Sequence, residues 1–384
     1  MDQTNSSDLG EVDDKRTIKQ QDKLNMPNMK KIIALLLFLV CILIGKSQNF
    51  LISGKVIDAE TKQPLQGASV FCIQTTIGTV VNSEGSFSMR LPSGGYELGI
   101  SFNGYETISE RINEHMEGLI DKVWELKPKE KTLEAVSIVF TSEVKDGWEK
   151  YGDFFKAQFI GTSENAKSCS ITNPEVLRFY YYKKKDKLKV TSKEDLIINN
   201  PALGYQVRYQ LDSFIHEYKT GATESTGLPF FKQLDGNESD SLRWVEKRSE
   251  AYYGSILHFF RCYYDSTLNL NGYKLEYINE QTGSPIQFKN PYDSSIYTKT
   301  IHDELELNLT GKIRVQYKEE KPSLIYLSEK KFPTSTPFQI SIIKFLNGIT
   351  IEENGYFYDQ HDIFYSGYMD WEKLGDMLPY DFDL

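Results

Sequence analysis

The sequence has few of the residues that usually form metal and redox sites. Its 384 residues include five histidines and four cysteines, and no two cysteines stand in a CxxC arrangement. No histidine is followed by glutamate three positions later, so the HxxE and HExxH pairs that hold catalytic zinc in peptidases are missing. The sequence therefore predicts no catalytic residue, no cofactor-binding residue and no metal ligand.

The cysteines are also too few to specify a disulfide framework. Cys41 lies in an apolar run near the N-terminus, which leaves Cys72, Cys169 and Cys262 for the rest of the chain. An odd number of scattered cysteines defines no set of pairs. We expect three buried free thiols, with a single disulfide between two of them as the open alternative.

Positive charge is scarce as well. The chain has 44 Lys and Arg against 54 Asp and Glu, which gives a net charge of −10 at pH 7. Phosphate backbones and anionic membrane surfaces repel a protein of this charge. We therefore expect neither nucleic acid nor an anionic membrane surface as a partner.

No apolar run reaches the roughly 18 residues expected of a membrane-spanning helix. The run at residues 32–44 follows Met29 and two lysines, and small residues ending at Ser47 come after it. A basic start, a short apolar run and small residues before a cleavage point are the three parts of a secretory signal peptide. This pattern predicts that the protein is exported.

Two alternatives remain open for this N-terminal region. Residues 29–48 are either a signal peptide that is cleaved after Ser47 or an uncleaved signal anchor in the inner membrane, which is the one membrane contact that we expect. Residues 1–28 are a polar N-terminal extension without an apolar face, unless the true start is Met29.

Residues 50–127 have the alternation and turn spacing of a small antiparallel β-sandwich. Phe87, Met89 and Leu91 alternate with polar residues, and glycines at positions 85, 94 and 95 mark turns. The glycine-rich stretch leads into strands rather than into a helix, which excludes a phosphate-binding loop. The expected strands are residues 50–57, 68–73, 78–81, 87–91, 96–102 and 123–126.

Several stretches of this region carry a resemblance. They are Gly54-Lys-Val-Ile-Asp, Pro64-Leu-Gln-Gly-Ala-Ser-Val, Gly78-Thr-Val-Val-Asn-Ser-Glu-Gly-Ser-Phe, Leu91-Pro-Ser-Gly-Gly-Tyr and Ile100-Ser-Phe-Asn-Gly-Tyr-Glu-Thr. In this order and spacing they resemble the carboxypeptidase regulatory-like domain, a prealbumin-like (transthyretin-like) β-sandwich that is abundant in envelope proteins of Bacteroidota-type bacteria. The resemblance implies a periplasmic or outer-membrane-associated protein. The domain has no catalytic residues of its own, so carboxypeptidase activity is not expected.

Residues 128–141 are expected to form a linker. A similar segment follows this domain in starch-utilisation-type TonB-dependent transporters, where a plug and a barrel come next. A 22-stranded barrel needs roughly 200–240 residues in its strands alone, which leaves too little chain here for plug and loops. The chain is therefore not expected to be such a transporter, although an accessory role beside one remains an alternative.

Residues 142–384 are expected to form an α+β domain with an antiparallel sheet, so that the whole protein is mainly β. Ser142 would cap a helix at residues 142–159, and a helical region at residues 242–263 would break at Gly254. The other expected elements are a hairpin from residues 176–182 and 187–191, a strand at 203–211, hairpin turns at 308–311 and 347–348, and a short helix at 367–378 that stops before a proline.

Within this domain, four residues form a candidate binding cluster. On a helix, His258, Arg261 and Asp265 share one face at spacings of three and four, and Ser255 precedes them. The cluster fits an anion-binding or glycan-binding face, or a surface ion pair that positions the helix. By contrast, the acidic stretches at residues 302–304 and 352–353 are expected to be isolated solvated turns.

Motifs spread through residues 154–380 also resemble an uncharacterised C-terminal region that accompanies the sandwich in many Bacteroidota proteins, among them Asn200-Pro-Ala-Leu-Gly-Tyr and Gly367-Tyr-Met-Asp-Trp. This resemblance implies no activity. The sequence thus predicts an exported, non-enzymatic envelope protein in which the sandwich docks or assembles an α+β domain that contacts a protein or glycan partner. The alternative is a hydrolase of unrecognised type built around Ser255, His258 and Arg261.

Overall fold

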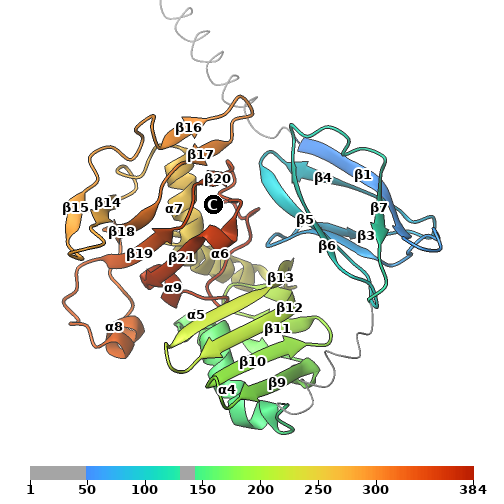
Figure 1. Cartoon of the computed structure of the whole chain (residues 1–384), viewed down its shortest axis with the longest axis horizontal. Coiled ribbons are helices and arrows are strands. Elements are labelled where there is room, and N and C mark those ends of the chain that lie inside the picture. Colours follow the sequence, from blue (N-terminus) through green and yellow to red (C-terminus); the bar gives the residue numbers. More distant parts are fainter. Residues whose placement is uncertain (1–48, 130–142) are drawn as a thin grey trace, which may run out of the picture. The chain divides into compact units, whose positions relative to one another are not determined.

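The computed structural model describes residues 49–129 and 143–384 (Figure 1). The predicted signal segment, most of the predicted linker and Ser142 lie outside the described residues. Strands β1 to β7 form two sheets, in the orders β4-β1-β7 and β3-β2-β5-β6. Their bounds are β1 Asn49–Asp58, β2 Ser69–Cys72, β3 Gly78–Val80, β4 Ser86–Pro92, β5 Gly95–Ser101, β6 Ile108–Asn113 and β7 Lys122–Leu126.

The sandwich predicted at residues 50–127 is confirmed, with two differences. All six expected strands are present, but β6 was not expected, because Glu110 and Arg111 interrupt its apolar alternation. The two sheets are also not wholly antiparallel, since β7 pairs parallel with β1. Gly54 is required at this pairing, because a Cβ atom there would lie 1.9 Å from the Lys122 carbonyl oxygen.

Residues 143–384, which we call the second region, contain a sheet in the order β8-β11-β12-β10-β9, with β13 added beside β12. Helix α4 packs Phe155 and Phe159 against its inner face, where Phe214 lies within 5.1 Å of Phe155 between ring centroids. The bounds of these elements are α4 Gly147–Phe159, α5 Glu164–Ser168, β8 Ser170–Ile171, η1 Pro174–Val176, β9 Leu177–Tyr182, β10 Lys187–Ser192, β11 Leu196–Asn200, β12 Tyr205–Glu217 and β13 Ala222–Gln233.

The helix predicted at residues 142–159 begins later than expected. Its N-cap is Asp146, because the preceding residues extend along β9. Glu143 forms an isolated bridge with Tyr180, and the Val144 N–H donates to the Phe179 carbonyl at 2.8 Å. Pairing with the sheet edge thus overrides the helical pattern over these residues.

A second antiparallel sheet runs in the order β15-β14-β18-β19-β21. Helix α7 covers its inner face with Phe259, Phe260 and Tyr263, and the predicted break at Gly254, where φ is +81°, separates α7 from α6. The bounds are α6 Glu238–Tyr252, α7 Ile256–Tyr264, β14 Tyr273–Ile278, β15 Pro285–Gln287, β18 Gly311–Tyr317, α8 Leu324–Lys330, β19 Gln339–Phe345, η2 Gln360–Asp362, β21 Ile363–Gly367 and α9 Tyr368–Trp371.

The hairpin turns predicted at residues 308–311 and 347–348 are wrong. At both places the chain leaves one sheet and enters another, because β17 and β20 pair with each other in a separate sheet ordered β16-β17-β20. The strands of that sheet are β16 Tyr297–Lys299, β17 Leu305–Leu307 and β20 Ile349–Ile351. Gly311 and Gly348 lie where the chain passes from one of these sheets to the other. They permit a bend in the chain rather than the reversal of a hairpin.

The helix predicted at residues 367–378 is much shorter than expected. It ends at Trp371, and Glu372 is already extended, with ψ of 102°. The Gly375 N–H instead donates to the Ile160 carbonyl at 2.8 Å, which ties this segment to the end of α4.

The three cysteines of the described residues are buried and unpaired, as expected. Cys72, Cys169 and Cys262 lie in three different hydrophobic clusters, so no two of them are within reach of a disulfide. Burial raises the pKa of the Cys169 thiol to about 12 and that of Cys262 to about 11, which keeps both protonated.

Candidate functional site

Ser255, the first residue of the predicted binding cluster, is the N-cap of α7. Its hydroxyl oxygen accepts a hydrogen bond from the His258 N–H at 3.2 Å and donates to the Tyr252 carbonyl at 2.6 Å. The first bond caps the start of α7, which is the ordinary role of a serine at this position, and the second satisfies the carbonyl at the end of α6. The hydroxyl is therefore committed to main-chain groups on both sides.

His258 is buried, with 3% of its surface exposed. Its Nδ1 accepts from the Gly254 N–H at 3.2 Å and lies 3.0 Å from the Tyr273 hydroxyl. The rings of four tyrosines surround the imidazole, namely Tyr252, Tyr253, Tyr273 and Tyr317. Burial lowers the pKa of His258 to about 4, so the ring is neutral at neutral pH.

Arg261 binds the main chain of residues 380–382, which we call the C-terminal segment. Its Nε donates to the Asn354 carbonyl at 3.0 Å, and its Nη2 donates to the Tyr380 and Phe382 carbonyls at 2.9 Å each. Asp265 is the exposed C-cap of α7, and no ion pair joins it to Arg261 in the described structure. The helix predicted for these residues is present, but the side chains are directed to separate structural partners.

A different set of polar groups links the sandwich to the second region through the turn between β2 and β3. Gln74 has a left-handed backbone, with φ of +55°. Its N–H donates to the Pro229 carbonyl at 2.6 Å, and its own carbonyl accepts from the Tyr380 N–H at 2.8 Å. Next to it, the Phe231 N–H of β13 donates to the Thr75 carbonyl at 2.9 Å. Main chain from three distant parts of the sequence thus meets at this turn.

Side chains extend the same interface. Both the N–H and the hydroxyl of Thr76 donate to the Asp381 carboxylate, the former at 2.9 Å. Phe71 of β2 contacts Phe230 of β13 edge to face at 5.5 Å, and the Arg208 guanidinium lies 5.3 Å from both ring centroids. These contacts make the sandwich part of one compact unit with the second region.

The prediction of solvated turns at residues 302–304 and 352–353 is confirmed for the exposed His302, Asp303 and Glu353 but is wrong for Glu304 and Glu352. Glu304 pairs with the Arg111 Nη2 of β6 at 2.7 Å and accepts from the Asn113 amide at 2.9 Å. Glu352 is 5% exposed and accepts from the Tyr358 hydroxyl at 2.7 Å. Burial, with the nearby Glu304 charge, raises the pKa of Glu352. For Glu304, the sandwich supplies partners that the sequence did not reveal.

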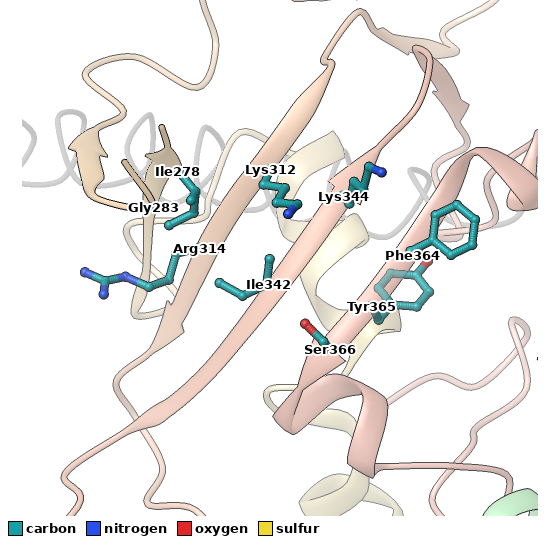
Figure 2. A pocket seen from close by; sticks show the side chains of 9 residues that line it. All are labelled: Ile278, Gly283, Lys312, Arg314, Ile342, Lys344, Phe364, Tyr365 and Ser366. Carbon is teal, nitrogen blue, oxygen red and sulfur yellow. The ribbon is translucent and has the colours of Figure 1, made fainter. Parts of the chain in front are cut away.

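The outward face of the sheet β15-β14-β18-β19-β21 presents both charged and apolar side chains. An open pocket of about 560 Å³ lies over β14, β18, β19 and β21 (Figure 2). We refer to this surface as the outward sheet face. Its lining residues are Ile278, Gly283, Lys312, Arg314, Ile342, Lys344, Phe364, Tyr365 and Ser366.

Two rows of side chains run across the outward sheet face. In one row, Lys312 of β18 lies directly opposite Lys344 of β19, which in turn lies opposite Phe364 of β21. In the next row, Arg314 lies opposite Ile342, which lies opposite Ser366. Phe364 is 54% exposed, so the row ends on an uncovered aromatic ring.

The charges on this face are not equally compensated. Arg314 is directed away from the lysine pair, as Figure 2 shows, and donates through Nε to Glu276 at 2.7 Å. Lys274 and Gln316 also donate to Glu276, each at 2.9 Å, and these donors lower its pKa although burial alone would raise it. Lys312 and Lys344, by contrast, form no ion pair with any described residue.

Sequence reasoning missed the outward sheet face. The alternation of Lys312 and Arg314 with buried Ile313 and Val315 is a strand signal that was available in the sequence. The pairing of β18 with β19, which brings Lys344 beside Lys312, had no such local signal.

In the described ranges 49–129 and 143–384, no helix is both long enough and apolar enough to cross a membrane. The apolar run at residues 32–44 is not among the described residues.

Comparisons with known proteins give one family match. Residues 52–138 match the family model of the CarboxypepD_reg-like domain. No curated protein matches the chain.

Three solved structures show limited likeness. One is a catechol 1,2-dioxygenase from Acinetobacter sp. ADP1, inhibited by bound mercury, with 14% identity over 22% of this chain and 54% of that chain, and a TM-score of 0.18. A putative membrane-associated protein of unknown function from Bacteroides fragilis NCTC 9343 has 12% identity over 49% of this chain and 96% of that chain, with a TM-score of 0.18. The Bacillus anthracis TIE protein has 13% identity over 49% of this chain and 32% of that chain, with a TM-score of 0.17. The match thus spans about half the length of the dioxygenase and a third of the TIE protein.

Proposed function

We propose that this chain, whose residues 52–138 are a CarboxypepD_reg-like domain, is an exported cell-envelope protein that works by binding a partner. The sandwich holds the second region in place, and the second region presents the outward sheet face to the partner. The observation that carries the proposal is this face: a strand surface with an open pocket, two unpaired lysines and an exposed phenylalanine.

Export is supported by the sequence pattern at residues 29–48 and by the family of the sandwich. An accessory role beside a TonB-dependent transporter is one form that such binding takes. For the alternative, a hydrolase at Ser255 and His258, the geometry gives no support. The serine hydroxyl is committed to the helix cap, and the imidazole is enclosed by tyrosine rings.

Export and binding are tested together by purifying the tagged protein from fractionated cells. The chain is expected in the envelope fraction, with an N-terminus after Ser47 or with the anchor retained. A partner should co-purify with the wild type and with Val245→Asp, which alters an exposed residue of α6, but not with Phe364→Asp. Recovery in the cytoplasm, or equal co-purification with both variants, would contradict the proposal.

A further inference from the structure

The outward sheet face differs from the opposite face of the same sheet. Alternate residues of β18 and β19 point to opposite sides. Ile313, Val315 and Ile343 are buried in the cluster under α7. Lys312, Arg314, Ile342 and Lys344 lie on the other side, where no described element covers them.

The cross-strand pair Lys312 and Lys344 is unfavourable for the isolated protein. Like charges directly opposite each other in an antiparallel sheet destabilise it, and a carboxylate within reach removes that cost. One row away, the Glu276 carboxylate compensates Arg314 and Lys274 by forming an ion pair with each. Neither lysine of the pair forms an ion pair with a described carboxylate, although Glu280 lines the adjoining pocket together with both. A group from outside the chain that supplies further negative charge completes the compensation.

Apolar surface adjoins the two lysines. Phe364 lies opposite Lys344, Ile342 lies in the neighbouring row, and Ile340 further along β19 is 36% exposed. An inorganic anion would neutralise the lysines but would leave these side chains in water. A segment that carries both carboxylate and apolar side chains satisfies both kinds of group.

The net charge of the whole chain narrows the class of partner. The chain has a net charge of −10, which repels an extended polyanion such as a membrane surface or a nucleic acid. A short protein segment touches only the local patch, where the lysines dominate within a Debye length of about 10 Å. Charge complementarity therefore favours a protein segment over a larger polyanion.

We propose that the outward sheet face binds an acidic, partly apolar segment of a partner protein. The carboxylates of this segment pair with Lys312 and Lys344, and its apolar side chains pack on Ile342 and Phe364. This inference rests on the binding role proposed above and names the chemistry of the partner. It is tested on purified full-length protein, so an error about export leaves the readout unchanged.

The test uses an array of synthetic dodecapeptides in which Glu or Asp alternates with Leu, Val or Phe at varied spacing. Matched peptides carry Gln and Asn in place of the acids. The acidic peptides should bind with an affinity that falls with added salt. The double variant Lys312→Gln/Lys344→Gln should weaken the best peptide at least tenfold. The control pair Lys183→Gln/Lys184→Gln, exposed between β9 and β10, removes the same charge and should change affinity less than twofold.

The thermal midpoint of each variant shows whether it is folded, and that of Lys312→Gln/Lys344→Gln should not fall, because a like-charge pair is removed. The proposal is overturned if no acidic peptide binds, if the Gln and Asn peptides bind equally, or if both double variants weaken binding alike. It is also overturned if inorganic phosphate or vesicles of anionic phospholipid compete as well as the peptide. Phe364→Ala should weaken the acidic peptide without changing its salt dependence.

Discussion

His258 shows how burial determines the chemistry of a single residue. Sequence spacing placed it among candidate binding residues, yet the ring is enclosed and accepts a hydrogen bond from the Gly254 main chain. Its pKa of about 4 lies below the ordinary value of 6.5 because the charged form would lose its hydration. The neutral ring thus contributes to stability above pH 6.5, and this contribution is lost as the pH falls from 6.5 towards 4.

His258→Gln isolates this effect, because a glutamine oxygen can accept the same hydrogen bond but does not titrate. The variant should be less stable than the wild type at pH 7.5. Its deficit should shrink by about 2–3 kcal/mol at pH 4.5, because there the unfolded wild type takes up a proton on His258 that the folded protein largely does not. Urea unfolding at the two pH values measures the difference. Glu352, whose raised pKa has the opposite sign, affects both proteins equally and cancels. A deficit that does not change with pH would rule out a buried neutral ring.

At the scale of elements, the turn between β2 and β3 joins the sandwich to two distant parts of the chain. β13 and the C-terminal segment bond to its main chain, and the Asp381 carboxylate accepts from both donors of Thr76. A hydrogen bond to a charged acceptor stabilises a fold more than one between neutral groups.

Thr76→Val removes the hydroxyl donor and leaves the shape of the side chain. The variant should lower the free energy of unfolding by about 1–2 kcal/mol. Thr79→Val on β3 is the matched control, because Thr79 is similarly half-buried and makes no side-chain hydrogen bond in the described structure. Urea unfolding of both variants measures the contrast. If the two variants are equally stable, Thr76 does not hold the interface.

Local pattern predicted most elements of the sandwich, because apolar alternation and turn glycines are local signals. It failed where a distant element decides the conformation. Residues 143–144 extend along β9 instead of joining α4, and the glycine-containing turns near residues 308–311 and 347–348 lead from one sheet to another. Neither outcome follows from a window of neighbouring residues.

At the scale of the whole molecule, the described part of residues 49–384 forms one compact unit. Pairs such as Arg111 with Glu304 join the sandwich to the second region across long sequence separations. The sandwich is therefore packed into one unit with the second region, and the docking or assembly role predicted from the sequence stays a prediction. Its family was predictable from ordered local motifs, and residues 52–138 match that family.

The candidate site was the least predictable part of the molecule. The four residues singled out on α7 share a helix, as predicted, but they serve as a cap, a buried ring, a tie to the C-terminal segment and an exposed end. Lys312 and Lys344 gain their significance only from the register between β18 and β19. Register across a long connection depends on the packing of the whole sheet, which local spacing does not encode.

Photo-crosslinking in living cells tests most directly whether the outward sheet face binds a partner. A photoreactive amino acid is placed at Ser366, in the row of Ile342 on this face, and in a second strain at Val245, which is 64% exposed on α6. Mass spectrometry then sequences the attached peptides. We predict a discrete adduct at position 366 whose attached peptide is rich in Asp and Glu, and none at position 245. No adduct at position 366, or the same adducts at both positions, would contradict the account.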